Sequence, residues 1–97
     1  MSRRKCTDKD GIIFTPERRD EVWGKADIVR GKDTNLYRKD VAGNILYKPS
    51  YGLDTPKGWE IDHINPVGNG GSDNLRNLQV LQTATNQSKG DTYPWNP

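Results

Sequence analysis

The sequence predicts a small α+β domain, and three observations lead to that fold class. The chain has 97 residues, which suits a single domain. One segment, beginning at Thr15, carries the start signals of a helix, and the segments 36–48 and 59–81 each read as a pair of short strands. No repeat or low-complexity stretch interrupts this order. Helical and strand segments are therefore expected to form one mixed domain.

The first helix is expected to start at Thr15-Pro16-Glu17. Threonine can cap the helix, proline is preset for the first helical position, and glutamate favours the positive end of the helix dipole. Gly31 lies beyond the end of this segment. The expected apolar side of the helix consists of Val22, Trp23 and Ala26.

A β-hairpin is expected over residues 36–48. Gly43-Asn44 supplies the turn, and the flanking Tyr37, Ile45 and Tyr47 favour strands. Pro49 ends the second strand because proline cannot donate a ladder hydrogen bond.

The second half predicts two strands and a helix. Residues 59–64 and 78–81 read as strands, separated by a glycine-rich loop over 67–73. A short helix is expected from Thr83, an eligible cap, to Lys89, with Gly90 as its stop. This helix contains poor helix formers, so packing or an ion must fix it.

Composition restricts the class of protein. Only 31% of residues are hydrophobic, and no run approaches the length of a membrane span or resembles a signal peptide. The single cysteine, Cys6, excludes an intrachain disulfide and the paired cysteines of a structural zinc site. We therefore expect a cytoplasmic protein that contacts no membrane. Residues 1–11 lack periodicity and are expected to form a flexible basic arm preceding a single domain over 12–97.

Charge is distributed unevenly along the chain. The net charge is +2, but residues 1–50 hold 12 Lys or Arg against 8 Asp or Glu, whereas residues 51–97 hold 3 against 5. A cationic surface next to a more acidic segment suits a nuclease, whose basic side chains hold phosphates while acidic ones hold a metal. An ordinary solvated surface is the alternative explanation of the same distribution.

The segment 58–90 holds the groups that decide the function. The only histidine, His63, follows Asp62, and Asn77, Asn86 and Lys89 come later at fixed spacing. Alone, each residue has an ordinary explanation, because asparagines often occupy turns and caps and a lone histidine is usually a surface or packing residue. Together they form a set suited to metal-assisted attack on a phosphodiester.

These residues resemble the motif of the HNH endonucleases, a family of ββα-metal nucleases. The resemblance rests on Asp62-His63-Ile-Asn-Pro66, Gly70-Gly71, Asn77-Leu-Gln-Val-Leu81 and Asn86-x-x-Lys89, and covers about a third of the chain. The last histidine of the family motif is asparagine here. The resemblance implies a ββα-metal fold for this part of the chain and DNA as the substrate.

The resemblance also implies roles for individual residues. Asp62 and Asn86 are expected to hold one divalent ion, and because both ligands are hard oxygens that ion is expected to be Mg²⁺ or Mn²⁺. His63 is left as the general base, since an imidazole with a reference pKa of about 6.5 can take a proton from water near neutral pH. Asn77 is expected to brace the loop between the strands and to help orient the histidine, and Lys89 is expected to contact a phosphate or to steady the scissile group. Further backbone contacts are expected from Arg38, Lys39 and Arg76.

One geometric conflict accompanies these roles. Neighbouring residues of a regular strand point to opposite faces, so Asp62 and His63 can share a site only if the strand twists or ends there. Asn65-Pro66 directly afterwards favours such an end.

The sequence thus predicts a metal-dependent DNA endonuclease that nicks one strand at a time, or cuts both strands as a homodimer or with another protein. A bacterial or phage source is expected by association only. Two alternatives remain: a nucleic-acid-binding module with a vestigial metal site, and a structural domain stabilised by a metal at the same residues.

Overall fold

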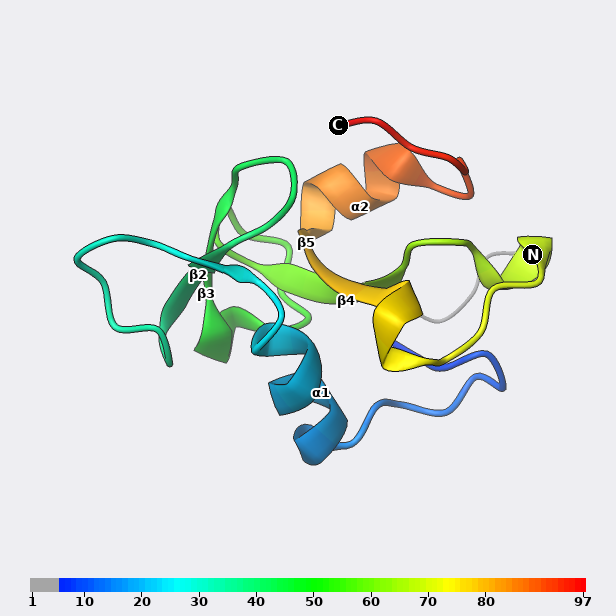
Figure 1. Cartoon of the computed structure of the whole chain (residues 1–97), viewed down its shortest axis with the longest axis horizontal. Coiled ribbons are helices and arrows are strands. Elements are labelled where there is room, and N and C mark those ends of the chain that lie inside the picture. The colour runs from blue at the N-terminus through cyan, green and yellow to red at the C-terminus, as the bar shows by residue number, and fades with distance from the viewer. Residues whose placement is uncertain (1–5) are drawn as a thin grey trace.

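The computed structural model describes residues 6–97, and it confirms the α+β fold class (Figure 1). Strands β1, β2 and β3 form one antiparallel sheet, and β4 and β5 form a separate antiparallel hairpin. In chain order the elements are α1 Pro16–Trp23, β1 Asp27–Ile28, β2 Tyr37–Lys39, β3 Ile45–Tyr47, the 3₁₀ turn Lys48–Ser50, β4 Trp59–His63, the 3₁₀ turns Val67–Asn69 and Leu75–Asn77, β5 Leu78–Gln82 and α2 Thr83–Lys89.

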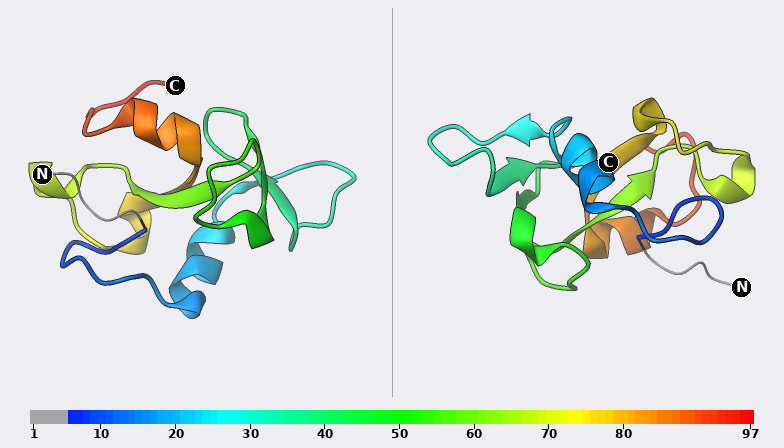
Figure 2. Two further views of the ribbon diagram at one scale, coloured as in Figure 1. Left: turned by 180° about the vertical axis from the view of Figure 1, so that it is seen from behind. Right: turned by 90° about the horizontal axis from the view of Figure 1, so that it is seen from below.

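The β4–β5 hairpin is the centre of the molecule. Helix α1 packs on one side of it and α2 on the other, as Figure 1 shows. The views in Figure 2 place the three-stranded sheet at one end of the hairpin and the loop of residues 64–77 at the other. The core lies between α1 and the hairpin, where the rings of Trp23 and Trp59 meet at 4.9 Å.

Helix α1 begins as its sequence predicts. The Thr15 hydroxyl accepts a hydrogen bond from the backbone N–H of Arg18, and Pro16 is the first helical residue. Val22 and Trp23 are buried, as expected. Ala26 also packs against the core, but it lies beyond the helix, which ends at Trp23.

The first sheet contains the predicted hairpin, β2 with β3, and one strand that the sequence did not indicate. That strand, β1, has only two residues, which is too short for a periodic signal. Asp40 fixes the hairpin to the second half of the chain, because its buried carboxylate accepts from the backbone N–H groups of Asn44 and Gln82.

The second half also follows the predicted order of strand, loop, strand and helix. The helix cap differs from the prediction: Gln82 precedes α2, while the Thr83 hydroxyl donates to the carbonyl of Leu53. Gly90 ends the helix with a φ of 54°. The short helix is therefore held by packing and by side-chain contacts across to β4, rather than by its own cap.

The expected arm over 1–11 falls partly outside the described residues, which begin at Cys6. Residues 6–11 form a turn instead of an arm, with Thr7 buried and bridged to Ile13. The backbone N–H of Lys9 donates to Asp73, which joins this turn to the loop of residues 64–77. In residues 6–97, no helix has the length and apolar character needed to cross a bilayer.

Candidate active site

Strand β4 presents two sets of side chains. It pairs with β5 without interruption from Trp59 to His63, so its side chains alternate between faces. Trp59 and Ile61 enter the core. Glu60 and Asp62 contact side chains of α2 on the opposite face. Two carboxylates are thus buried between β4 and α2.

Asp62 is enclosed by two donors. Its side chain is 6% exposed, and it accepts hydrogen bonds from Nε2 of Gln79 at 2.9 Å and Nζ of Lys89 at 3.2 Å. Burial raises the pKa of the Asp62 carboxyl above its usual range, and the contacts with Gln79 and Lys89 oppose that rise without cancelling it. A buried carboxylate of this kind is stabilised by a cation.

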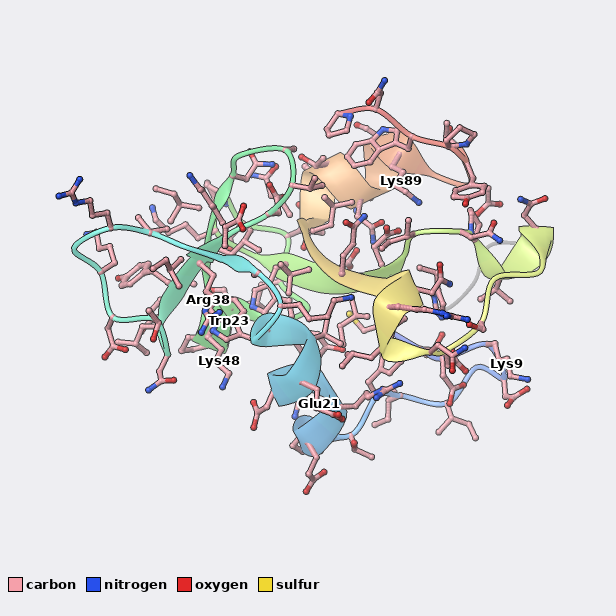
Figure 3. All side chains as sticks on the ribbon, in the orientation of Figure 1. Lys9, Glu21, Trp23, Arg38, Lys48 and Lys89 are labelled. Carbon is pink, nitrogen blue, oxygen red and sulfur yellow. The ribbon has the colours of Figure 1, made fainter. Side chains whose placement is uncertain are left out.

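Lys89 supplies that cation in this structure. Its side chain is 2% exposed and lies between α2 and the hairpin (Figure 3), where Nζ also donates to the carbonyl oxygen of His63 at 3.2 Å. The sequence predicted that Lys89 contacts a phosphate or steadies the scissile group. In this structure the ammonium group is turned inward and ion-paired with Asp62.

Asn86 lies one helical turn before Lys89 and contacts the other buried carboxylate. Its amide nitrogen donates to Oε1 of Glu60 at 2.9 Å, and Glu60 is 2% exposed. Glu60 lies outside the motif that the sequence indicates, although its position two residues before Asp62 in a strand places both on one face. Glu60, Asp62 and Asn86 together bring three hard oxygen-bearing side chains to one layer.

His63 lies on the other side of β4. Its imidazole, 9% exposed, has Nε2 at 2.7 Å from Oδ1 of Asp73 and packs near the ring of Phe14, with centroids 6.0 Å apart. The strand does end at His63, as expected, but the side chains of Asp62 and His63 contact different partners. Asp73 was not singled out from the sequence because it lies in a glycine-rich loop with no motif of its own.

Asn77 braces the loop that carries Asp73. Its amide oxygen accepts from the backbone N–H of Asn65 at 2.9 Å, and its amide nitrogen donates to the carbonyls of Asn65 and Ser72. Gly71 lies so close to this point that a Cβ there would overlap the carbonyl oxygen of Asn65. The loop is therefore closed on itself by one side chain and one close backbone approach.

The three predicted phosphate contacts differ in their surroundings. The Arg38 guanidinium donates to the carbonyls of Thr34, Gly24 and Ala26, so these contacts stabilise the fold. Lys39 and Arg76 have exposed side chains.

Two adjoining cavities both have Gln79 of β5 in their lining. One, of about 240 Å³, is lined by Lys39 and by Gln79, the residue that donates to Asp62. The other, of about 170 Å³, is lined by Gln79, Lys89 and Trp95. Solvent space therefore reaches the partners of Asp62, with Lys39 at its border.

The residues suit a divalent cation by the chemistry of their donors. Within residues 6–97 no group of three or more His, Cys, Asp or Glu side chains converges on one point. A cation between β4 and α2 would therefore need the amide oxygen of Asn86 beside the carboxylates of Glu60 or Asp62. Mg²⁺ commonly binds through one or two carboxylates and keeps several waters, so this set fits it.

Comparison with known families identifies the class of protein to which this site belongs. Residues 51–95 match the sequence model of a family described as HNH endonuclease. The match spans β4, β5 and α2 and confirms the resemblance that the sequence indicates. No match was found among curated proteins or among solved structures.

Residues 51–95 are accordingly similar to an HNH endonuclease domain. This similarity indicates nuclease activity, that is, hydrolysis with DNA as the substrate.

Proposed function

We propose that this chain is a metal-dependent endonuclease that hydrolyses DNA phosphodiester bonds with a water molecule activated by His63. The products expected are 5′-phosphate and 3′-hydroxyl ends. The observation that carries the proposal is the pair of buried carboxylates between β4 and α2, on a strand whose last residue carries the chain's only imidazole.

Asp62 and Asn86 are the proposed ligands of one Mg²⁺ or Mn²⁺ ion. Such an ion supplies charge neutralisation at the phosphate and stabilises the 3′ leaving oxygen. Asp62 is already desolvated and paired with a cation, Lys89. The side chain of Lys89 would then move away from Asp62 when the site is loaded, and the bordering cavity gives it space.

His63 is the proposed general base. It takes a proton from water, the resulting hydroxide adds to phosphorus, and the bond from phosphorus to the 3′ oxygen breaks. The leaving 3′ oxygen takes a proton from solvent water, and the imidazolium returns its proton to solvent. In-line displacement requires the attacking and leaving oxygens on opposite sides of phosphorus. Strand β4 ends at His63, which is the condition under which the base and the cation ligand Asp62 can reach the same phosphate.

Lys39 and Arg76 are the proposed contacts to the DNA backbone. Both are exposed, and Lys39 lines the cavity beside Gln79. Three backbone carbonyls already accept hydrogen bonds from the Arg38 guanidinium, so only the remaining part of that group is available to contact DNA. One site per chain cuts one strand per encounter, so nicking is the expected activity and double-strand cleavage would need a dimer.

The Lys89–Asp62 ion pair favours one alternative function. Because Lys89 already neutralises Asp62, the chain could be a DNA-binding module whose metal site is vestigial. That module would bind DNA with a steep salt dependence and without metal, and it would leave every strand intact.

Replacing the imidazole tests the proposed nuclease directly. We expect His63→Ala to lower the rate of plasmid nicking about 10²- to 10⁴-fold, the usual contribution of a general base. Gel-shift affinity for DNA should be retained, and a thermal melt should show that the variant is folded. Undiminished cleavage by this purified variant would contradict the mechanism, since the chain has no other histidine.

A further inference from the structure

The contact between His63 and Asp73 is the feature that the proposed function leaves unexplained. Oδ1 of Asp73 lies 2.7 Å from Nε2 of His63, a short separation typical of a hydrogen bond to a charged acceptor. The two residues are ten positions apart, on β4 and on the loop that follows it. The contact therefore depends on the shape of the whole loop.

Several independent interactions fix Asp73 in this position. The backbone N–H of Lys9 donates to both carboxylate oxygens, at 3.1 and 3.2 Å, and Nη2 of Arg18 donates to the main-chain carbonyl of Asp73 at 2.6 Å. Lys9 lies beside this loop in Figure 3. The Asn77 brace holds the neighbouring Ser72. Contacts from the segments before the hairpin and from within its connecting loop thus hold Asp73 in place.

A second residue also restrains the His63 imidazole. Phe14 packs near the His63 ring, and only a small part of the ring reaches solvent. An imidazole held by a ring on one side and a carboxylate at one nitrogen has one orientation. It also has one neutral tautomer, because the carboxylate accepts only from a protonated nitrogen.

We infer that Asp73 is a positioning residue for the general base: it accepts the Nε2–H of His63 and so reserves Nδ1 as the atom that takes the proton from water. The kinetic consequence of this inference rests on the proposed nuclease function, whereas the tautomer of His63 is independent of that function. Carboxylates that orient an imidazole in this way are common behind catalytic and metal-binding histidines.

The tautomer can be measured without any cleavage assay. The chain has one histidine, so two-bond ¹H–¹⁵N correlation spectra of the uniformly labelled full chain in EDTA report on His63 alone. At about pH 8.5, where an ordinary imidazole is neutral, we expect the Nε2–H tautomer in the wild type. Asp73→Ala should give a mixture of tautomers, and Asp54→Ala, which removes an exposed carboxylate elsewhere, should match the wild type.

The kinetic consequence is tested with Asp73→Asn, which keeps the shape of the side chain. We expect the single-turnover nicking rate to fall roughly 10- to 100-fold, a typical cost of losing such a partner. DNA affinity and the dispersion of the backbone amide spectrum should be unchanged, because Arg18 binds a main-chain oxygen that the variant retains.

The outcomes separate the two claims. An Nδ1–H tautomer in the wild type, or the same single tautomer in Asp73→Ala together with an unchanged nicking rate in Asp73→Asn, would overturn the positioning role. A wild-type protein that shows the expected tautomer and its loss in Asp73→Ala, yet never cuts DNA, would support the role of Asp73 while overturning the proposed nuclease.

Discussion

At the residue scale, the site is governed by how its buried charges are compensated. Glu60 and Asp62 lie under α2, where Asn86 donates to one and Lys89 to the other. Removing a carboxylate from water costs free energy that a neutral donor recovers only in part. A divalent cation would compensate these buried charges further than one lysine does, and this is the physical basis of the metal site that we propose.

The raised pKa of Asp62 predicts a specific pH dependence of stability. A carboxyl with a higher pKa in the folded state than in the unfolded state binds protons more tightly when folded. Its stabilising contribution is thus fully present below the unfolded pKa of about 3.9 and is lost as the pH rises through the folded value.

The variant Asp62→Asn isolates this effect. In EDTA, the free energy of unfolding of the wild type should fall relative to that of Asp62→Asn as the pH is raised from about 3 to 7. Urea denaturation of both proteins across that range measures the difference. A difference that grows in favour of the wild type as the pH rises would show that the carboxylate is stabilised, not strained, by its surroundings.

The sequence predicted which residues surround the site better than it predicted their contacts. Asp62, His63, Asn77, Asn86 and Lys89 could be named because their spacing forms a motif. The inward direction of the Lys89 side chain could not be predicted, because it depends on how α2 crosses β4. Glu60 was missed although strand alternation places it on the same face as Asp62, whereas Asp73 was missed because an acidic residue in a loop carries no pattern until the fold brings it to a partner.

At the scale of elements, the loop of residues 64–77 is the part that shapes the site. It leaves β4 at His63, closes through Asn77, and returns Asp73 to the imidazole. The close approach of Gly71 to the carbonyl of Asn65 makes that closure possible. A change that opens the loop should therefore affect activity and stability together.

Two glycines of the same loop give a matched test. Gly71→Ala should lower the free energy of unfolding by about 1–3 kcal/mol, the usual cost of overpacking, because its Cβ would overlap Asn65. Gly68→Ala should be nearly neutral, since nothing lies within 4 Å of the Cβ it would add. Chemical denaturation compares them, and equal losses in the two variants would contradict the tight closure.

Element boundaries followed from local signals where those signals were strong. The Thr15-Pro16 start of α1 and the hairpin turn at Gly43 were readable because capping, proline and turn chemistry act within a few residues. The strand β1 and the Gln82 cap of α2 could not be predicted in this way, because they depend on contacts between distant residues. Strand β1 pairs with β2, and the Thr83 hydroxyl donates to the carbonyl of Leu53.

At the scale of the whole molecule, the apolar core is small, so the binding of a cation contributes to the stability of the folded chain. The buried apolar cluster lies between α1 and the hairpin, whereas α2 covers a largely polar layer. A cation that binds the folded chain and not the unfolded one adds to its stability by mass action.

A divalent cation should therefore raise the melting temperature. At a concentration 100 times its dissociation constant, Mn²⁺ or Mg²⁺ should add about 2.7 kcal/mol, equivalent to a shift of several degrees for a chain of this size. Differential scanning calorimetry against EDTA measures the shift, and Asp62→Asn should remove most of it. An equal shift in both proteins would place the cation elsewhere.

The most direct test of the central claim is incubation of the purified protein with supercoiled plasmid in Mg²⁺, in Mn²⁺ or in excess EDTA, with Asp62→Ala alongside. We predict metal-dependent conversion to nicked circles that EDTA and the substitution both abolish. Intact plasmid with every metal, while DNA binding persists in a gel shift, would contradict the nuclease and favour the binding module.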